Sequence, residues 1–443
     1  MEVTTSKTIM FNARLIDGVK DTAIENGVLV FEHVRGYSDF PVRDRIVYAG
    51  ETAGYDVKAN TGPEDKAVDM TGYTLLPGLF NVHTHLDLTM PYMTYSYDVF
   101  GTAYRTLIAY RRMAEALNAG VTSIRSVGIG DYIDLAIKKA IEKGMMYGPE
   151  LTTSGPALLA NGGHGHNTYG KIECTGPDEF MKETRLLLSR GVDLIKIMLT
   201  GGAASAHEGM QDKQMTDEEV AAVVKVTHNA GKKVVAHLGG DKAIQDAIRL
   251  GVDSVEHGYF MSEETVKMMA DKGSYLVPTL SVTNCNDYLI GHGAPEFQVK
   301  KLADSAKSHM ESIRRAVKAG VKICCGTDLL PSDPIDGTNA TVREVELLVE
   351  AGLSPMQAIK AATSNSAELC GTIGHTGTLE AGKYGDVIAV KGAPDKNIRD
   401  LRNIELVARI CRLCWSTVPG LEIRRFHILP PGYEMTGGTY RKW

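Results

Sequence analysis

Two histidines stand two residues apart in the stretch NVHTHLD, which directly follows the apolar run LLPGLF. On a strand, residues i and i+2 point to the same face, so the imidazoles of His83 and His85 would aim at one point. Neutral imidazoles that converge are typical ligands of a divalent metal ion. A single HxH pair is equally compatible with two unrelated histidines at a strand end, so the other ligands must come from elsewhere in the chain.

Further polar side chains lie in or at the ends of other apolar runs. Lys196 lies in DLIKIML, His237 in KVVAHLG, His257 in DSVEHG and Asp328 in VKICCGTD. Histidine nitrogens and carboxylate oxygens are ligands of zinc and similar divalent ions. A lysine ammonium beside a metal would be repelled, so Lys196 needs a separate explanation, and a structural lysine is the simplest one.

The elements that must position these residues form a regular pattern. Eight short apolar runs alternate with helical segments between about Leu75 and Ala361, namely LLPGLFNVHTH, VTSIRSV, ELTTSGPAL, DLIKIML, KVVAHLG, DSVEHG, SYLVPTL and VKICCGTD. Strands that alternate with helices indicate parallel βαβ units, and eight units predict an α/β fold of the (β/α)8 TIM-barrel type. Barrel enzymes carry their chemistry at the C-terminal ends of the strands. The six side chains are therefore expected to share one rim.

Both ends of the chain differ from this pattern, because they contain short strands separated by polar turns. We predict a barrel over residues 75–370 beside one small composite β-sandwich. Residues 1–74 would form the first part of the sandwich, and residues 371–443 its second part and a C-terminal extension.

Composition excludes several functional classes. The 443 residues are 43% hydrophobic and 23% charged, and the net charge of -6 leaves no basic surface for nucleic acid. No apolar run is long enough to span a membrane, and the start MEVTTSKTIMFNARLID lacks the features of a signal peptide. Seven cysteines spread over the chain do not form a disulfide framework. A cytoplasmic protein without nucleic-acid or membrane partners is expected.

The complete set of polar residues resembles the amidohydrolase superfamily in its two-metal form. That family carries HxH on strand one, a bridging lysine on strand four, histidines on strands five and six, and an aspartate on strand eight. The matching positions here are His83, His85, Lys196, His237, His257 and Asp328. The lead-in LLPGLFNVHTH and the returning segment GTLEAGKYGDVIAV also resemble the family's bipartite β-sandwich.

The resemblance implies a role for each residue. Lys196 would carry CO2 as a carbamate, which is anionic and bidentate and can bridge two divalent ions, with zinc as the expected metal. His83, His85 and Asp328 would complete the shell of one ion, and His237 and His257 that of the other. Two such ions can hold a hydroxide between them. Asp328 would take its proton during attack and pass it to the leaving nitrogen.

Substrate contacts are expected from the loop ANGGHGHNTYG after strand three, whose glycines allow a close approach of the backbone to a ligand. His164 and His166 could donate to a carbonyl or carboxylate, although a loop with solvent-facing histidines is the alternative. Tyr169 is a candidate for the pocket wall, and Arg125 is a candidate partner for a carboxylate.

Finer motifs resemble one branch of the superfamily, in which imidazolonepropionase-like proteins, prolidases, Xaa-Arg dipeptidases and ochratoxin-hydrolysing amidases occur. The motifs are GVTSIRSVG, GGHG, KIMLTGG and SVEHG. The resemblance implies a homo-oligomeric hydrolase that releases a C-terminal amino acid from a dipeptide or an N-acyl amino acid. Open alternatives are a cyclic amide hydrolase, a deaminase, a xenobiotic amidase or carbamate hydrolase on the same metals, and a non-catalytic metal-binding protein.

Overall fold

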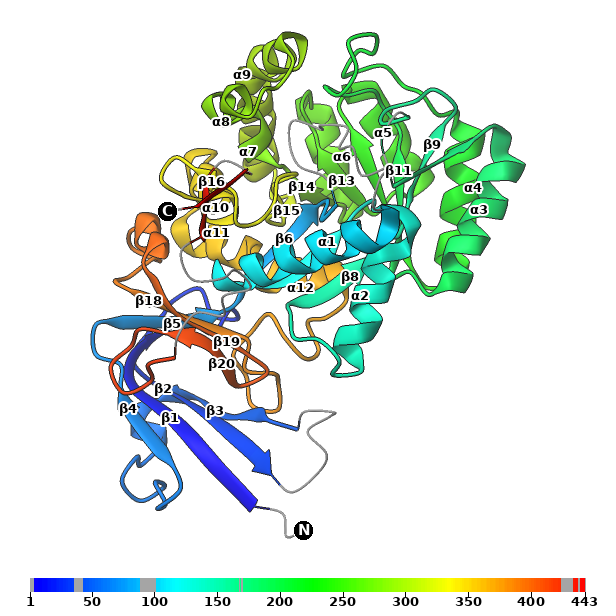
Figure 1. Cartoon of the computed structure of the whole chain (residues 1–443). Coiled ribbons are helices and arrows are strands. Elements are labelled where there is room, and N and C mark those ends of the chain that lie inside the picture. The colour runs from blue at the N-terminus through cyan, green and yellow to red at the C-terminus, as the bar shows by residue number, and fades with distance from the viewer. Residues whose placement is uncertain are drawn as a thin grey trace.

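The computed structural model of the chain describes residues 4–35, 43–87, 101–166, 168 and 170–423, together with the strands β21 (Tyr433–Thr436) and β22 (Thr439–Lys442). Figure 1 shows a barrel of strands and helices with a β-rich region beside it. Of the described helices, none is long and apolar enough to cross a membrane.

The barrel is built from parallel strands in two hydrogen-bonded groups. The first group is β6 (Leu79–Thr84), β7 (Val121–Ser126) and β8 (Glu150–Thr153). The second is β10 (Lys171–Cys174), β9 (Ala157–Ala160), β11 (Leu194–Met198), β12 (Lys233–Leu238), β13 (Ser254–His257), β14 (Tyr275–Val277) and β15 (Lys322–Ile323). Backbone hydrogen bonds of 2.8 Å join the groups on both sides, from Asp193 N to Thr153 O and from Val82 N to Cys325 O. These bonds close the predicted (β/α)8 barrel.

The third apolar run, ELTTSGPAL, was predicted as one strand but forms two in the structure. It divides into β8 and β9 around Gly155, whose φ of 60° lies in the left-handed region that glycine adopts readily. Strand β9 then pairs with β10, which the eight-run pattern does not contain.

Helices surround the barrel and begin and end where local chemistry requires. They are α1 (Gly101–Asn118), α2 (Ile133–Glu142), α3 (Gly176–Arg190), α4 (Asp217–Asn229), α5 (Asp241–Leu250), α6 (Glu263–Lys272), α7 (Leu280–Thr283), α8 (Asn286–Gly291), α9 (Glu296–Lys318), α10 (Ala340–Glu350), α11 (Pro355–Ala361) and α12 (Ser364–Cys370). Thr216 and Glu219 form a capping box at the start of α4. Helices α5 and α6 end at Gly251 and Gly273, both left-handed.

Both ends of the chain form the β-rich region, as predicted. Its sheet has the order β20-β19-β18-β5-β1-β2-β3, and β4 pairs with β1. The strands are β1 (Thr4–Leu15), β2 (Ile24–Arg35), β3 (Arg45–Glu51), β4 (Lys66–Asp69), β5 (Tyr73–Pro77), β18 (Val387–Lys391), β19 (Ile404–Arg409) and β20 (Arg412–Ser416). The smaller elements are the hairpin β16 (Pro334–Ile335) and β17 (Thr338–Asn339) and the 3-10 helices Thr52–Gly54, Gly130–Tyr132 and Ile398–Arg402.

One hydrophobic cluster spans both regions, and the β-rich region has a second cluster of its own. Ile388, Val407 and Trp415 of the β-rich sheet pack in the same buried cluster as Leu76 and the inward faces of the barrel helices. Trp415 is 1% exposed. Burial of apolar surface on both sides of this junction holds the barrel base against the sheet and leaves the opposite rim to the functional residues.

Candidate metal centre and active site

Three residues from the first and last barrel strands meet at the C-terminal rim. His83 is on β6, His85 follows that strand, and Asp328 follows β15. The Nε2 atoms of His83 and His85 lie 3.5 Å and 3.2 Å from Asp328 Oδ1. One candidate ligand atom from each residue lies within 4.8 Å of the others, and all three side chains are buried. This group can hold one metal ion.

Backbone geometry explains why Asp328 reaches this position. Its N–H donates to His83 O at 2.8 Å, which continues the pairing of strands eight and one beyond β15. Its φ of 55° then turns the chain into the left-handed region, where aspartate is among the better tolerated residues.

Lys196, His237 and His257 line the same small cavity as this group. The ring centroids of His237 and His257 lie 4.4 Å apart, and those of His83 and His257 lie 4.9 Å apart. Lys196 is completely buried on β11. All six predicted residues are therefore brought together at one end of the barrel.

Hydrogen bonds orient the histidine rings. His85 Nδ1 donates to Gly128 O at 3.0 Å, and His237 Nε2 donates to Gly201 O at 3.2 Å, because a carbonyl can only accept. His257 Nδ1 lies 2.6 Å from Thr279 Oγ1, and its buried Nε2 has no partner among the described residues. In each ring one nitrogen is anchored and the other keeps its lone pair for a metal, which is the arrangement seen around metal-binding histidines.

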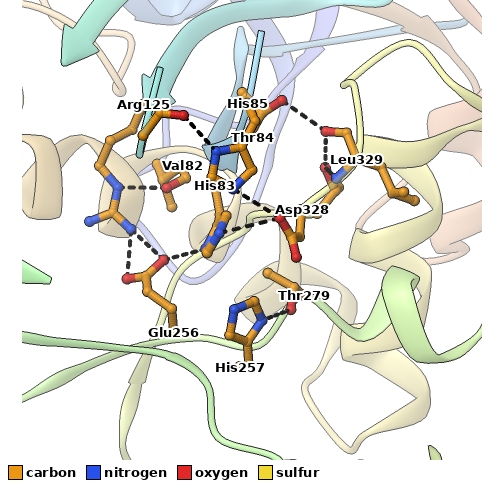
Figure 2. Close-up of polar contacts among 12 residues, drawn as sticks. Val82, His83, Thr84, His85, Arg125, Glu256, His257, Thr279, Asp328 and Leu329 are labelled. Atoms are coloured by element: carbon orange, nitrogen blue, oxygen red, sulfur yellow. Dashed lines mark hydrogen bonds and ion pairs between the residues drawn. The ribbon is translucent and has the colours of Figure 1, made fainter. Parts of the chain in front are cut away.

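Arg125 is placed differently from the expectation that it contacts substrate. It is 1% exposed, does not line the metal cavity, and its Nη2 lies 2.8 Å from both carboxylate oxygens of Glu256. Glu256 in turn accepts from His83 Nδ1 at 2.6 Å (Figure 2). It also accepts from Ser254 Oγ at 2.6 Å. Arg125 lies on β7, and its side chain faces the barrel interior below the rim. Its guanidinium therefore holds the carboxylate of Glu256, which orients His83. This placement makes Arg125 a positioning residue for His83 and puts its side chain outside the metal cavity.

Burial sets the charge states in this site. It lowers the pKa of His83, His237 and His257 well below the ordinary value, so these rings are in the neutral form that binds metal. Burial also lowers the pKa of Lys196 to about 8, against the opposing effect of Glu256 and Asp328. For Asp328 burial disfavours the charge, but its histidine and lysine neighbours lower the pKa to about 2.

The cavity offers more donors than the His83–His85–Asp328 group alone uses. Besides the His83–His85–Asp328 group, two neutral histidines and a buried amine face the same cavity. Lys196 Nζ has no hydrogen-bond partner among the described residues, which is costly for a buried ammonium. A covalent change that replaces this ammonium by an anion would remove the cost and add metal ligands.

The candidate substrate residues are placed unequally. His164 lines the cavity, its ring centroid lies 4.3 Å from that of His237, and its Nδ1 lies 2.7 Å from Glu208 Oε1. Gly202 packs against it so closely that an added Cβ would lie 2.3 Å from its Cε1. The side chain of His166 does not line the cavity, and its Nδ1 donates to Gly163 O at 3.2 Å. Tyr169 lies outside the described residues.

Lys171 is a cavity residue that sequence reasoning missed. It begins β10 and lines the metal cavity, and no hydrogen bond or ion pair joins it to another described residue. Burial lowers its pKa to about 8, while Asp87 and Asp328 act in the opposite direction, so it carries a positive charge at neutral pH. The GGHG motif lies close in sequence, but only the pairing of β10 with β9 brings this lysine to the rim.

His309 is a second missed residue, for which the sequence indicated no role. It is completely buried on α9, its Nε2 donates to His257 O at 3.1 Å, and its Nδ1 lies 3.0 Å from Thr283 Oγ1. His257 has a φ of 71°, so an anchor on its carbonyl stabilises a strained residue. No periodicity in the sequence points to this contact, because α9 and β13 lie far apart in the chain.

The buried state of His309 predicts a measurable pH dependence. Burial lowers its pKa to about 4. As the pH falls below about 6.5, the unfolded chain takes up a proton that the folded protein does not, so stability is lost as pH falls through this window. We expect His309→Gln to remove up to about 1.4 kcal/mol per pH unit from that loss. Urea unfolding of the metal-free protein between pH 6.5 and 4.5 measures it, and an unchanged slope would contradict the assignment. His207→Gln, at an exposed position, is the matched control.

Known proteins were compared with the chain in sequence and in structure. The sequence model of the Amidohydrolase family matches residues 74–409. The ochratoxinase of Aspergillus niger is 31% identical over 366 residues, which cover 76% of this chain and 74% of that protein. A solved Xaa-Pro dipeptidase with bound methionine in the active site has a TM-score of 0.78 and 30% identity, covering 92% of this chain and 99% of its own. A prolidase complexed with N-methylphosphonate-L-proline has a TM-score of 0.80 and 25% identity, covering 93% of this chain and 100% of its own.

Proposed function

The chain belongs to the amidohydrolase family and is a hydrolase that acts on C–N bonds, and from this premise we propose that it releases a C-terminal amino acid from a dipeptide or an N-acyl amino acid. The observation that carries the proposal is the single buried cavity that unites the six candidate ligands with the cation of Lys171. Relatives support the same substrate class, since one is an ochratoxinase, one is a dipeptidase that binds a free amino acid, and one is a prolidase.

His83, His85 and Asp328 would hold one divalent ion, and His237 and His257 a second, and the carbamate oxygens of a carboxylated Lys196 would serve as further ligands. Such ions, with zinc expected, supply a water that ionises near neutral pH and a Lewis acid for the carbonyl. The lowered pKa of Lys196, about 8, raises the minor fraction of neutral amine at neutral pH, and this form can add to CO2 with loss of one proton.

The remaining residues bind substrate and move protons. Asp328 is ionised at neutral pH, so an oxygen of its carboxylate can accept the proton of the attacking water and return it to the leaving nitrogen. His164, held by Glu208, presents its other nitrogen to the substrate carbonyl. Lys171 pairs with the carboxylate of the departing amino acid. We extend no such role to His166.

A mixed substrate library tests this function. Zinc-loaded enzyme is incubated with dipeptides, N-acyl amino acids, ring amides, aminated heterocycles, carbamates and ureas, and products are identified by mass spectrometry. Release of free amino acids that stops when a chelator removes the metal supports the proposal. A ring-opened product, a deaminated base or a cleaved carbamate, with the dipeptides and N-acyl amino acids intact, would replace it with a cyclic amide hydrolase, a deaminase or a xenobiotic hydrolase on the same residues.

Lys171→Met tests the carboxylate contact. Loss of one charge-assisted pair is expected to raise KM about tenfold or more for a substrate with a free C-terminal carboxylate, with a smaller change in kcat. The same substrate with a C-terminal amide is the matched control, because it cannot form the pair and should show no such penalty. An equal rise in KM for both substrates would assign Lys171 to the general shape of the cavity.

The family resemblance also supports two properties of the whole protein. We propose a homo-oligomer in the cytoplasm, and light scattering of the purified protein tests its mass in solution. A monomer at micromolar concentration would reject the first property without affecting the site.

A further inference from the structure

A second cavity lies at the opposite end of the barrel from the metal site. Its volume is about 680 Å³, and it is lined by the starts of barrel strands at Glu150, Leu194 and Lys233. The segment after α12, which includes His375 and Tyr384, contributes the wall towards the β-rich region. A volume of this size is typical of sites for small molecules. We call this space the basal cavity.

Positive charge exceeds negative charge along its wall. Five lining residues are arginine or lysine and three are acidic, namely Arg125, Lys138, Lys232, Lys233 and Arg409 against Glu142, Glu150 and Asp193. Asp193 pairs with Lys138 at 2.6 Å, and Glu150 lies 2.7 Å from His375 Nε2. Arg125 and Arg409 also have carboxylate partners, in Glu256 and Asp386. Lys233 donates to the carbonyls of Glu368 and Leu369 at the end of α12. Neither Lys232 nor Lys233 pairs with a carboxylate of the described residues.

Arg125 presents an unused pair of N–H donors to this space. Its Nε donates to Val82 O at 2.5 Å, and its Nη2 donates to Glu256. Its Nη1 has no hydrogen-bond partner among the described residues and points away from Glu256 in Figure 2. The side chain is 1% exposed and lines the basal cavity. Because Arg125 lines the basal cavity and its Nη1 donates to no described residue, an anion bound in this space could accept a charge-assisted hydrogen bond from it.

We propose that the basal cavity binds a small organic carboxylate with an apolar body. The carboxylate would accept hydrogen bonds from Arg125 Nη1 and from the ammonium groups of Lys232 and Lys233. The apolar body would pack on Leu151, Leu194, Val235 and Leu369, which line the same space. The basal cavity is separate from the metal centre, but charged residues link the two. The guanidinium of Arg125 lines the basal cavity and also contacts Glu256, the carboxylate that orients His83.

Matched aromatic probes test the proposal on the metal-loaded enzyme. 4-Iodobenzoate carries the charge and the apolar body, and 4-iodobenzamide has the same shape without the charge. We expect calorimetry to show benzoate binding that is about tenfold or more tighter than amide binding. The anomalous signal of iodine in crystals should place the benzoate beside Arg125. Iodine found only at the metal centre, equal affinity for both probes, or no binding of the benzoate would each overturn the proposal.

Variants separate the basal cavity from the metal centre. Arg125 is unsuitable because it supports Glu256, so we use Lys232→Gln combined with Lys233→Gln, which lie outside the active site. This double variant should lose about tenfold or more of the benzoate affinity and keep the wild-type kcat/KM. Lys225→Gln combined with Lys267→Gln, two exposed lysines on α4 and α6, is the control and should bind like wild type. Wild-type affinity in the Lys232/Lys233 variant would overturn the proposal.

Discussion

Asp328→Asn is expected to lower kcat by about 10²–10⁴-fold while the metal content stays near that of the wild type. Asparagine keeps the shape of the side chain and one oxygen that can face a metal, but it cannot accept a proton at neutral pH. The left-handed backbone at this position, with φ of 55°, suits asparagine as well as aspartate, so folding is unaffected. Steady-state kinetics on the substrate found in the library and elemental analysis of the same samples measure both effects.

The control for this variant comes from the same loop. Asp336 also has a positive φ, of 50°, but its half-exposed carboxylate pairs with Arg343 and lies outside the metal cavity. Asp336→Asn should therefore retain the wild-type kcat. If Asp328→Asn kept activity within a few-fold of wild type with its metal bound, Asp328 would be a ligand only, and the proton would need another acceptor.

Lys196→Met is expected to remove about one metal ion per chain and to reduce turnover to the background rate. Methionine fills a similar volume but cannot carry CO2. Because Lys196 Nζ is buried without a partner, the metal-free variant should be at least as stable as the metal-free wild type. Elemental analysis after dialysis against zinc, together with urea unfolding, distinguishes loss of a ligand from loss of the fold.

Lys225→Met, at an exposed position on α4, is the control for a lysine replacement and should bind metal like wild type. Two ions per chain in Lys196→Met would show that the lysine does not bridge them. The candidate ligands would then be the four histidines and Asp328 alone, and the buried amine would need another explanation.

Much of the fold and the ligand set could be predicted because each signal is local. His83 and His85 follow the period of a strand, and His237 and His257 end apolar runs that the barrel brings to one rim. The alternation of apolar runs with helical segments was sufficient to predict the barrel, because neighbouring parallel strands are connected by crossover helices. The position of these residues at the ends of the predicted strands was therefore enough to predict that their side chains lie in one cavity.

The supporting contacts could not be predicted in the same way. The side chains of β7 are buried on both faces, so alternation does not show whether Arg125 points to the rim or below it. Glu256 is adjacent to His257 in sequence, yet its partner His83 is 173 residues away. Lys171 and His309 reach the site through β10 and α9, which lie outside the eight-strand repeat. Side-chain direction and long-range packing decide all of these contacts.

The left-handed backbone at His257 and Asp328 restricts which amino acids can replace them without distortion. With φ values of 71° and 55°, both positions suit asparagine, aspartate, histidine and glycine far better than β-branched residues. Alanine scanning would here combine lost chemistry with backbone strain and overstate the role of either side chain. Because asparagine also suits this backbone, a single Asp328→Asn substitution would leave the fold intact. An evolutionary descendant of this enzyme that carried it could bind metal and substrate without catalysing hydrolysis.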